Sequence, residues 1–381
     1  MNQDGTAPPA VPEFRWLRTG EEGFAAMQAA ILAARESVRL ETYTFAPGPL
    51  AERFREVLLA ACRSGARVRV LVDGLGSREL PDSFWGPLRE AGGECRWFNP
   101  LSLERFTYRD HRKVLVCDQR VAVVGGFNIA SEYDGDGVTR GWRDLGLHIT
   151  GSLAAELAEN FDAMFARADF QHRRLQTFRP ARDHVRSGQD WRLLLSGPGR
   201  RHGEIKRTLA RDLAAAHTVQ IVAAYFLPTW RLRRELQRVA RRGGRVQLIL
   251  AGRSDVRLAQ LASRRLYHRF LRAGVEIHEY QPQVLHAKLF MVDGVVYVGS
   301  SNLDARSLQI NYELVVRLAD ATVTAEARTL FGQILEHCRR IDRAAWRRSR
   351  TVWSRLQERW AYFLLARLDP LIARWQLKWL R

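Results

Sequence analysis

Lysine is nearly absent from this basic chain, in which only four of the 60 basic residues are lysine and the rest are arginine. Lysine carries a compact ammonium group and arginine a planar guanidinium group, so the two are not interchangeable where geometry matters. Two of the four lysines, Lys113 and Lys288, each follow a histidine by two residues and precede an aspartate by five. This spacing indicates that lysine is retained where a phosphate must be held beside a histidine.

Cysteine and long apolar segments are also scarce. The four cysteines form no CxxC pair and no cluster with histidine, so we expect neither a zinc site nor a disulfide framework, and a reducing, cytosolic compartment is favoured. No run of about 18 apolar residues predicts a transmembrane helix, and the N-terminal residues predict no signal peptide. If such a protein acts on lipid, it has to dock on the membrane from the aqueous side.

The charge of the chain predicts an anionic partner. Its formal net charge is +19 at pH 7, which favours either nucleic acid or an anionic membrane surface. With 381 residues the chain is too long for one ordinary hydrophobic core, and its 46% hydrophobic content is typical of a folded protein. We therefore expect two folded domains.

The second half of the chain repeats the order of elements in the first. Strands expected over 38–45 and 67–73 flank a helix, and strands expected over 219–226 and 245–250 do the same. The offset is 175 residues at the motif histidines and 178 at the second strand of each pair. This duplication predicts an α/β fold of two similar tandem domains. We place the first repeat at 1–167, a linker at 168–192, the second repeat at 193–342 and a distinct C-terminal segment at 343–381.

The repeated motif can support phosphoryl chemistry. Two histidines from two similar domains suggest one shared site on a pseudo-twofold axis. One imidazole would attack the phosphorus of a phosphodiester and form a phosphohistidine, while the other protonates the departing alcohol. The lysines would neutralise the oxygens of the transition state, and this chemistry requires no metal or other cofactor. The candidate catalytic residues are His111, Lys113 and Asp118 in the first motif and His286, Lys288 and Asp293 in the second.

Small and polar residues follow each motif at a similar distance. Asn128 lies 17 residues after the first motif histidine, and Asn302 lies 16 residues after the second. Gly126 in Gly-Gly-Phe-Asn and Ser300 in Gly-Ser-Ser-Asn precede them. Small residues let backbone N–H groups approach an anion, and an asparagine amide adds a further donor. We expect these four residues to bind the phosphate of the substrate.

Each catalytic imidazole also needs a carboxylate that fixes its tautomer. Asp144 in Trp-Arg-Asp and Glu313 in Asn-Tyr-Glu are the candidates.

The segments HRKVLVCD…GGFN and HAKLFMVD…GSSNLDARS resemble the two HKD motifs of the phospholipase D superfamily, and the resemblance covers nearly the whole chain. Within that superfamily the chain is most similar to bacterial cardiolipin synthases of the short type without N-terminal transmembrane helices. The resemblance implies two phospholipase D-like domains, each a mixed β-sheet flanked by helices, with one shared active site. It also implies a metal-independent, two-step transphosphatidylation, in which the asparagines contact phosphate and the acidic residues orient the histidines. It does not fix which histidine is the nucleophile, and we favour His111.

Two points about charged residues stay open. Asp118 and Asp293 fall at expected hairpin turns, where aspartate is a normal turn residue. They could organise the loops and strands, which we favour, or contact the phosphate directly. Arg109 and Arg112 flank His111 and are the best candidates among the arginines for binding substrate charge.

The C-terminal segment predicts a basic amphipathic helix. Trp346, Trp353 and Trp360 recur every seven residues among many arginines. Such a helix is typical of an interfacial membrane element that contacts anionic lipid, and the alternative is a helix packed on the protein's own core. Asp369-Pro370 is expected to end the helix, and 375–380 is expected to form a second short one.

The resemblance and the tail together favour a cardiolipin synthase that works as a peripheral protein on the cytoplasmic face of a bacterial membrane and is not secreted. Its partners would be phosphatidylglycerol and cardiolipin in an anionic membrane, whereas nucleic acid is a less favoured partner. The alternatives are a phospholipase D-type hydrolase, a nuclease or phosphodiesterase of the same superfamily, and a basic membrane-binding protein without activity. The acceptor alcohol and the oligomeric state stay open.

Overall fold

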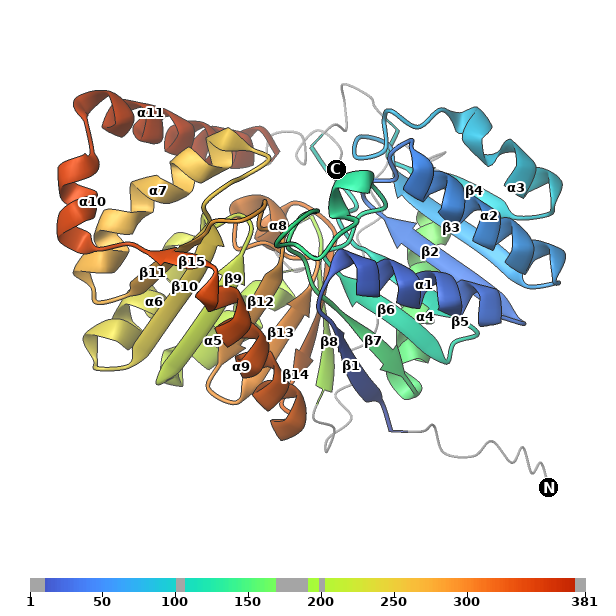
Figure 1. The fold of residues 1–381 in the computed structure, drawn as a ribbon, viewed down its shortest axis with the longest axis horizontal. Helices are drawn as coiled ribbons and strands as arrows, with labels where there is room; N and C mark the ends of the chain where they lie inside the picture. Colours follow the sequence, from blue (N-terminus) through green and yellow to red (C-terminus); the bar gives the residue numbers. More distant parts are fainter. Residues whose placement is uncertain (1–10, 101–106, 169–190, 199–202, 374–381) are drawn as a thin grey trace.

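Two similar halves lie side by side in the protein (Figure 1), a computed structural model that describes residues 11–100, 107–168, 191–198 and 203–373. Each half is one β-sheet with helices packed on both faces.

The first half contains seven strands and four α-helices among the described residues. The strands are β1 (Glu13–Leu17), β2 (Ser37–Thr42), β3 (Arg67–Asp73), β4 (Glu94–Phe98), β5 (Val114–Cys117), β6 (Val121–Gly125) and β7 (Gly146–Thr150). The helices are α1 (Gly20–Ala33), α2 (Pro49–Arg63), α3 (Gly86–Glu90) and α4 (Ser152–Arg167). The strand order is β1-β7-β6-β5-β2-β3-β4, with β2, β3 and β4 parallel and the other pairs antiparallel.

The second half repeats this order. Its strands are β8 (Trp191–Ser196), β9 (Thr218–Ala223), β10 (Arg245–Ala251), β11 (Glu276–Tyr280), β12 (Lys288–Val292), β13 (Val295–Gly299), β14 (Glu313–Leu318) and β15 (Cys338–Arg340). Its helices are α5 (Glu204–Ala215), α6 (Trp230–Arg241), α7 (Arg257–Arg272), α8 (Ala305–Gln309) and α9 (Ala321–Glu336). Read from β8, the order β8-β14-β13-β12-β9-β10-β11 matches that of the first sheet, and β15 is added at the far edge. The predicted α/β class with two duplicated mixed sheets is therefore confirmed.

Local sequence signals explain where several of these elements begin. The hydroxyl of Thr19 accepts a hydrogen bond from the backbone N–H of Glu22 at 3.1 Å and caps α1. Phe24, Met27 and Ile31 then recur on the buried face of that helix. The capping residue and the apolar spacing together fix both the start and the orientation of α1.

One apolar cluster joins the two halves. It contains Val116 and Leu147 from the first sheet together with Val222 and Leu289 from the second. Separate clusters lie under the outer helices of each half. Because the central cluster takes residues from both repeats, burial of apolar surface holds the halves together and sets the position of any site between them.

The predicted linker at 168–192 lies almost entirely outside the described residues. Its first position and its last two are described, and the last two differ from the prediction, because β8 already begins at Trp191. β8 pairs with β14 as β1 pairs with β7, so the second repeat starts with this edge strand.

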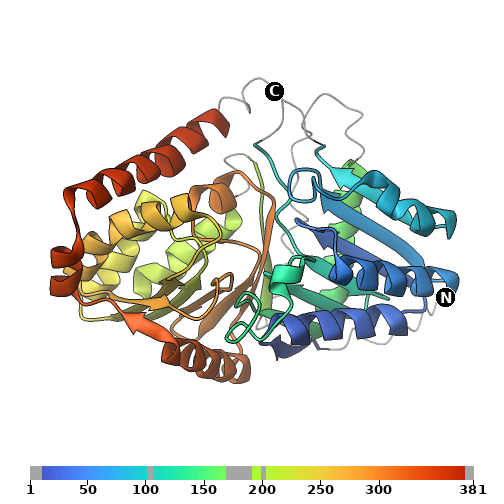
Figure 2. The same cartoon turned by 45° about the horizontal axis from the view of Figure 1, so that its top comes forward.

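The C-terminal segment forms two helices where one was predicted, α10 (Arg343–Ser349) and α11 (Val352–Phe363). The chain turns at Arg350, and Thr351 caps the second helix through the N–H of Ser354. Figure 2 shows α11, in dark red, running across the top of the second half toward the first.

The predicted end at Asp369-Pro370 is wrong, since the helix continues to residue 373 through a π-helical turn at Leu364–Leu368. The wider turn accommodates the ring and the missing N–H of proline. The predicted short helix at 375–380 lies outside the described residues.

Three tryptophans on one helical face were expected in this segment, and the structure places them in two environments. Trp346 packs against Tyr267 of α7, with ring centroids 5.0 Å apart. Trp353 and Trp360 on α11 are 66% and 59% exposed. The turn between α10 and α11 separates them. In the part of the chain that the structure describes, no helix combines the length and the apolar character needed to cross a membrane.

Candidate active site

The two motif histidines lie where the halves meet. Two residues separate His111 from the start of β5, and one residue separates His286 from the start of β12. The backbone N–H of His111 donates to the carbonyl of Tyr312 at 3.0 Å, and the N–H of His286 donates to the carbonyl of Arg143 at 2.8 Å. Tyr312 belongs to the second half and Arg143 to the first. The chain before each hairpin is thus held by a segment from the opposite repeat.

The same exchange brings a carboxylate to each histidine. Nδ1 of His111 lies 3.0 Å from Oε1 of Glu313, which belongs to the second repeat. Nδ1 of His286 lies 2.7 Å from Oδ2 of Asp144, which belongs to the first repeat. A carboxylate at Nδ1 favours the tautomer that carries its proton on Nδ1, which leaves Nε2 for chemistry. Each half therefore completes the histidine of the other.

Both motif lysines are buried beside their histidines. Nζ of Lys113 donates to the carbonyl of His111 at 2.7 Å. Nζ of Lys288 lies 2.8 Å from Nδ1 and 3.1 Å from Nε2 of His286. Burial is the main cause that lowers the pKa of Lys113 to about 7 and that of Lys288 to about 8.

The pKa values of the histidines fall for the same reason. Burial, followed by the positive charges of Lys113 and Lys288, holds the pKa of His111 well below its usual value. Burial and Lys288 also lower the pKa of His286, but the carboxylate of Asp144 opposes that shift. A phosphodiester between these groups would raise all four pKa values, because each cation would gain a counter-charge. The site is therefore built for an anion.

Burial also acts on the acid beside His111. It raises the pKa of Glu313 to about 8 against the lowering effect of Lys113. Ser300 donates a hydrogen bond from its hydroxyl to Glu313. Glu313 therefore carries less than a full negative charge near neutral pH, which limits its support for a protonated His111.

Gly126 and Ser300 do not form the predicted phosphate cradle. The N–H of Gly126 donates to the carbonyl of Leu145 at 3.2 Å, and the N–H of Ser300 donates to that of Leu314 at 2.9 Å. A Cβ on Gly126 would lie only 2.2 Å from Oδ1 of Asp144. The equivalent small residues thus serve the two acids, since glycine makes room for Asp144 while serine binds Glu313.

The two asparagines are buried in unequal environments. Nδ2 of Asn128 donates to the hydroxyl of Tyr133 at 2.6 Å, and its Oδ1 accepts from the N–H of Thr44 at 3.1 Å. Oδ1 of Asn302 is buried and has no hydrogen-bond partner. Since a buried acceptor without a donor is costly, Oδ1 of Asn302 remains available to accept a hydrogen bond from a substrate hydroxyl.

The motif aspartates lie at the opposite ends of their strands from the histidines. Asp118 accepts hydrogen bonds of 2.8 to 2.9 Å from the backbone N–H groups of Arg35, Glu36 and Ser37. Asp293 accepts from the backbone N–H groups of Thr218, the first residue of β9, at 2.7 Å and of His217, the residue before it, at 3.0 Å. Each aspartate lies seven positions after its histidine, which along a nearly extended chain is a span of roughly 20 Å. Direct contact with the phosphate is therefore excluded, and the organising role that we favoured agrees with this geometry.

Asp118→Ala is expected to lower the free energy of unfolding by about 2–3 kcal/mol, since three N–H groups lose their acceptor and alanine is strained at positive φ. Asp118 has a φ of 52°. Denaturant unfolding measures the loss, and Asp118→Asn, which keeps an acceptor and tolerates this φ, is the milder control. Turnover per folded molecule should change little. A large loss of turnover in either folded variant would contradict this role.

Arg109 and Arg112 are not available to a substrate, contrary to the expectation from the sequence. Both side chains are almost completely buried. Nη1 of Arg109 donates to the carbonyl of Asn99 at 2.8 Å, and Nε of Arg112 donates to Glu41 at 2.6 Å. These contacts fix the segment that carries His111, because a buried guanidinium group needs a partner.

Three aromatic residues that sequence reasoning missed surround the histidines. The hydroxyl of Tyr133 lies 3.2 Å from Nε2 of His286, and the ring of Trp142 lies 5.7 Å from the same imidazole. The ring of Tyr43 lies 5.0 Å from that of His111. Tyr133 and Trp142 fall in the loop between two predicted site residues, Asn128 and Asp144, and that position was the available signal.

Within the described ranges, no group of three or more His, Cys, Asp or Glu side chains is arranged to hold a metal ion.

Comparison with known proteins agrees with this geometry. The family model described as "Cardiolipin synthase, PLD-like domain" matches residues 27–167 and 209–335, one segment in each half. The chain is 30% identical to a cardiolipin synthase B of Salmonella typhi over 94% of this chain and 89% of that protein. It is 31% identical to a cardiolipin synthase of Halalkalibacterium halodurans over 85% of this chain and 66% of that protein.

Solved structures share the fold at lower sequence identity. The phosphatidylserine synthase of Haemophilus influenzae superposes with a TM-score of 0.74 at 14% identity, covering 96% of each chain. The polyphosphate kinase of Porphyromonas gingivalis reaches a TM-score of 0.60 at 16% identity, over 87% of this chain and 49% of that one. The family model and the relatives at 30% identity together show that this chain belongs to the phospholipase D superfamily, in its family of cardiolipin synthases with phospholipase D-like domains, which are phosphatidyltransferases.

Proposed function

We propose that this protein makes cardiolipin by transferring a phosphatidyl group from one phosphatidylglycerol to the glycerol hydroxyl of a second. The observation that carries the proposal is the pair of histidines, each held by a carboxylate from the opposite half and flanked by a buried lysine. Such an arrangement provides a nucleophile, a proton donor and charge for the phosphate oxygens within one site.

In the first step, Nε2 of His111 attacks phosphorus and the bond from phosphorus to the glycerol oxygen breaks. His286 donates the proton that this oxygen needs to leave as glycerol. In the second step, His286 takes a proton from the hydroxyl of the second lipid, whose oxygen attacks phosphorus and displaces His111. Lys113 and Lys288 neutralise the phosphate oxygens in both transition states.

The assignment of the two roles rests on the difference between the two carboxylates. His111 lies beside Glu313, whose raised pKa weakens its support for a protonated imidazole, and the pKa of His111 is itself held well below its usual value. His286 lies beside Asp144, which opposes the lowering of the pKa of His286. A neutral imidazole is the better nucleophile and a protonated one is the acid, so His111 attacks and His286 moves the proton.

The test is incubation of the full chain with phosphatidylglycerol vesicles, followed by separation of the lipids. Cardiolipin and free glycerol in equal amounts are expected. Phosphatidic acid with glycerol would identify a hydrolase instead, because water would have replaced the second lipid. Cleavage of DNA without any lipid turnover would overturn the proposal in favour of a nuclease.

The exposed face of α11 supports action at a membrane surface. Trp353, Leu356, Trp360 and Phe363 are between 45% and 66% exposed. They share one side of the helix, whereas Ala361 on the other side is buried against the second half. An apolar stripe that stays exposed among the described residues suits the interface of a bilayer. We place the enzyme as a peripheral protein on the cytoplasmic face of the membrane.

Replacing Trp353 and Trp360 by glutamine is expected to weaken binding to phosphatidylglycerol vesicles by about tenfold or more, since each buried aromatic side chain contributes on the order of 1–2 kcal/mol. Sedimentation with vesicles measures the effect. Turnover of a soluble diester should stay unchanged. Trp97→Gln, on β4 away from α11, is the matched control. Unaltered vesicle binding in the double variant would remove α11 as the membrane contact.

A further inference from the structure

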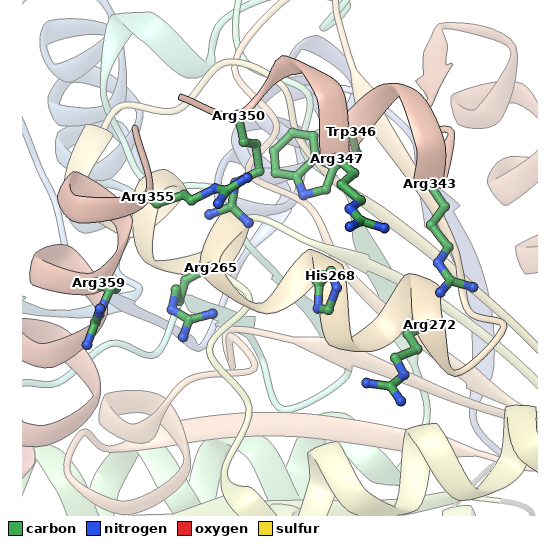
Figure 3. A pocket seen from close by; sticks show the side chains of 9 residues that line it. All are labelled: Arg265, His268, Arg272, Arg343, Trp346, Arg347, Arg350, Arg355 and Arg359. Atoms are coloured by element: carbon green, nitrogen blue, oxygen red, sulfur yellow. The ribbon is translucent and has the colours of Figure 1, made fainter. Parts of the chain in front are cut away.

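A cavity of about 600 Å³ lies between α7, α10 and α11 (Figure 3), and neither His111 nor His286 lines it. Seven of its nine lining residues are arginines. α7 contributes Arg265 and Arg272, α10 contributes Arg347, and α11 contributes Arg355 and Arg359, so the cavity exists only because the C-terminal segment folds back over α7. The cavity is therefore a cationic site that the two tail helices complete.

The positive charge of this cavity is mostly uncompensated. Over the described residues, the one ion pair formed by a lining arginine joins Arg350 and Glu358. Burial and then the charges of neighbouring arginines lower the pKa of Arg265, and the same two causes lower that of His268. Like charges held together in this way repel one another and are stabilised by a bound anion.

Two residues that line the cavity, Trp346 and Arg350, each carry a buried N–H without a partner. The two atoms are Nε1 of Trp346 and Nε of Arg350. An unpaired buried N–H is costly unless it serves a ligand. The planar guanidinium groups of the lining arginines match the oxygens of a phosphate, which accept several hydrogen bonds in fixed directions. The chemistry of the cavity thus points to a phosphate or a phosphodiester.

The cavity lies beside the exposed apolar face of α11. With about 100° between successive residues, Arg359 lies about 40° from Phe363 at the edge of the exposed stripe, and Arg355 lies about 80° from Phe363, toward the buried Glu358. This is the arrangement of a helix that rests in a membrane interface, in which arginines at the edge of the apolar face reach phosphate groups. The neighbouring face therefore identifies the bilayer as the source of the anion.

The same segment connects the cavity to the active site. After α11, Asp369 forms an ion pair with Arg306 at 2.8 Å. The carbonyl of Ala373 accepts a hydrogen bond from the hydroxyl of Tyr108, three residues before His111. From Arg359 to Ala373 the helical path is about 20 Å long. A lipid bound in the cavity would therefore hold the bilayer at a defined distance from the histidines.

We propose that the arginine-lined cavity binds the phosphodiester headgroup of an anionic phospholipid that stays in the bilayer and is not the reacting substrate. This second lipid site anchors α10 and α11 on the membrane and orients the active site toward it. The inference rests on the proposed action on membrane lipids, but its test reads binding and not turnover.

The test compares two double variants of the full chain with the same loss of charge. Arg347→Gln/Arg355→Gln removes two lining arginines, both exposed and without an ion pair among the described residues. Arg348→Gln/Arg367→Gln removes two exposed arginines of the same tail that do not line the cavity. Sedimentation is measured with vesicles of phosphatidylcholine alone and with vesicles that contain phosphatidylglycerol. Thermal unfolding shows that both variants fold.

The cavity variant is expected to bind phosphatidylglycerol vesicles about tenfold or more weakly than the wild type, while the control changes by less than about threefold. Neither should change the weak binding to phosphatidylcholine. If both variants lost the same amount of vesicle binding, the cause would be nonspecific electrostatic attraction to the membrane, and the proposal would be overturned. So would a cavity variant that binds the vesicles like the wild type but no longer binds inorganic phosphate, since the cavity would then serve a soluble anion.

Cardiolipin formation is followed in the same samples. A wild-type protein that binds through the cavity but makes no cardiolipin would refute the proposed reaction and leave the lipid site standing. A cavity variant that binds like the wild type, in a preparation whose wild type makes cardiolipin, would refute the lipid site alone.

Discussion

His111→Gln is expected to abolish turnover of phosphatidylglycerol and of a soluble p-nitrophenyl diester alike, each by about 10⁴-fold or more, since the nucleophile is needed whatever group leaves. His286→Gln is expected to abolish lipid turnover to a similar extent. It should nevertheless keep a rapid first release of p-nitrophenolate, because this stable anion leaves without a proton donor. Comparing a substrate whose leaving group needs a proton with one whose leaving group does not therefore shows which histidine is the nucleophile and which is the acid, a distinction that the sequence motif does not make.

The measurement is the burst of p-nitrophenolate in single-turnover experiments on the two variants. His148→Gln, a change on β7 outside the site, is the matched control and should behave like the wild type. If His111→Gln kept the burst and His286→Gln lost it, the nucleophile would be His286. If neither histidine mattered for the soluble diester, the shared-site mechanism would be wrong.

The second large effect concerns the carboxylates that cross between the halves. Asp144→Asn is expected to lower kcat by about 10²- to 10⁴-fold, in the range known for the acid that orients a catalytic histidine. Asp144 belongs to the first repeat but binds His286 of the second. The loss should therefore appear with phosphatidylglycerol and be small in the burst from the p-nitrophenyl diester, as for His286→Gln.

A double-mutant cycle checks this pairing. Asp144→Asn should add little to His286→Gln, because groups that act as a unit are not additive. Glu313→Gln should lower the burst from the soluble diester, since Glu313 positions His111. Its effect on kcat should be smaller than that of Asp144→Asn, because the pKa of Glu313 is raised to about 8 and the side chain is partly neutral already. Additive losses for Asp144 and His286 would contradict the crossed arrangement.

The aspartates of the motif illustrate where sequence reasoning succeeds. Asp118 and Asp293 were expected at hairpin turns, and both have positive φ at the turn between two short strands. Turn chemistry is local, so residue types within a few positions of each other are enough to predict it. The strands, the helices that precede them and the duplication follow from equally local periodicity.

The arginines and small residues of the site show where local reasoning fails. Arg112 adjoins His111 in sequence, yet its guanidinium group binds Glu41 on β2. Gly126 and Ser300 occupy equivalent positions before the asparagines, yet they serve two carboxylates and not a phosphate. Direction and burial of a side chain depend on which strands become neighbours, and adjacency in sequence does not determine that.

By itself the sequence determined the two repeats, the α/β class and the family, and it predicted the two histidines, the two lysines and the two acids of the site, because period, turn residues and motif spacing are local properties. Only the tertiary structure decided that Glu313 serves His111 and Asp144 serves His286, and that α10 and α11 fold over α7 to enclose an arginine-lined cavity. The physical reason is that both features form where distant segments pack together. Burial of apolar surface between the halves, and of α11 on the second half, sets those contacts, and the pKa values and charge of each site follow from them.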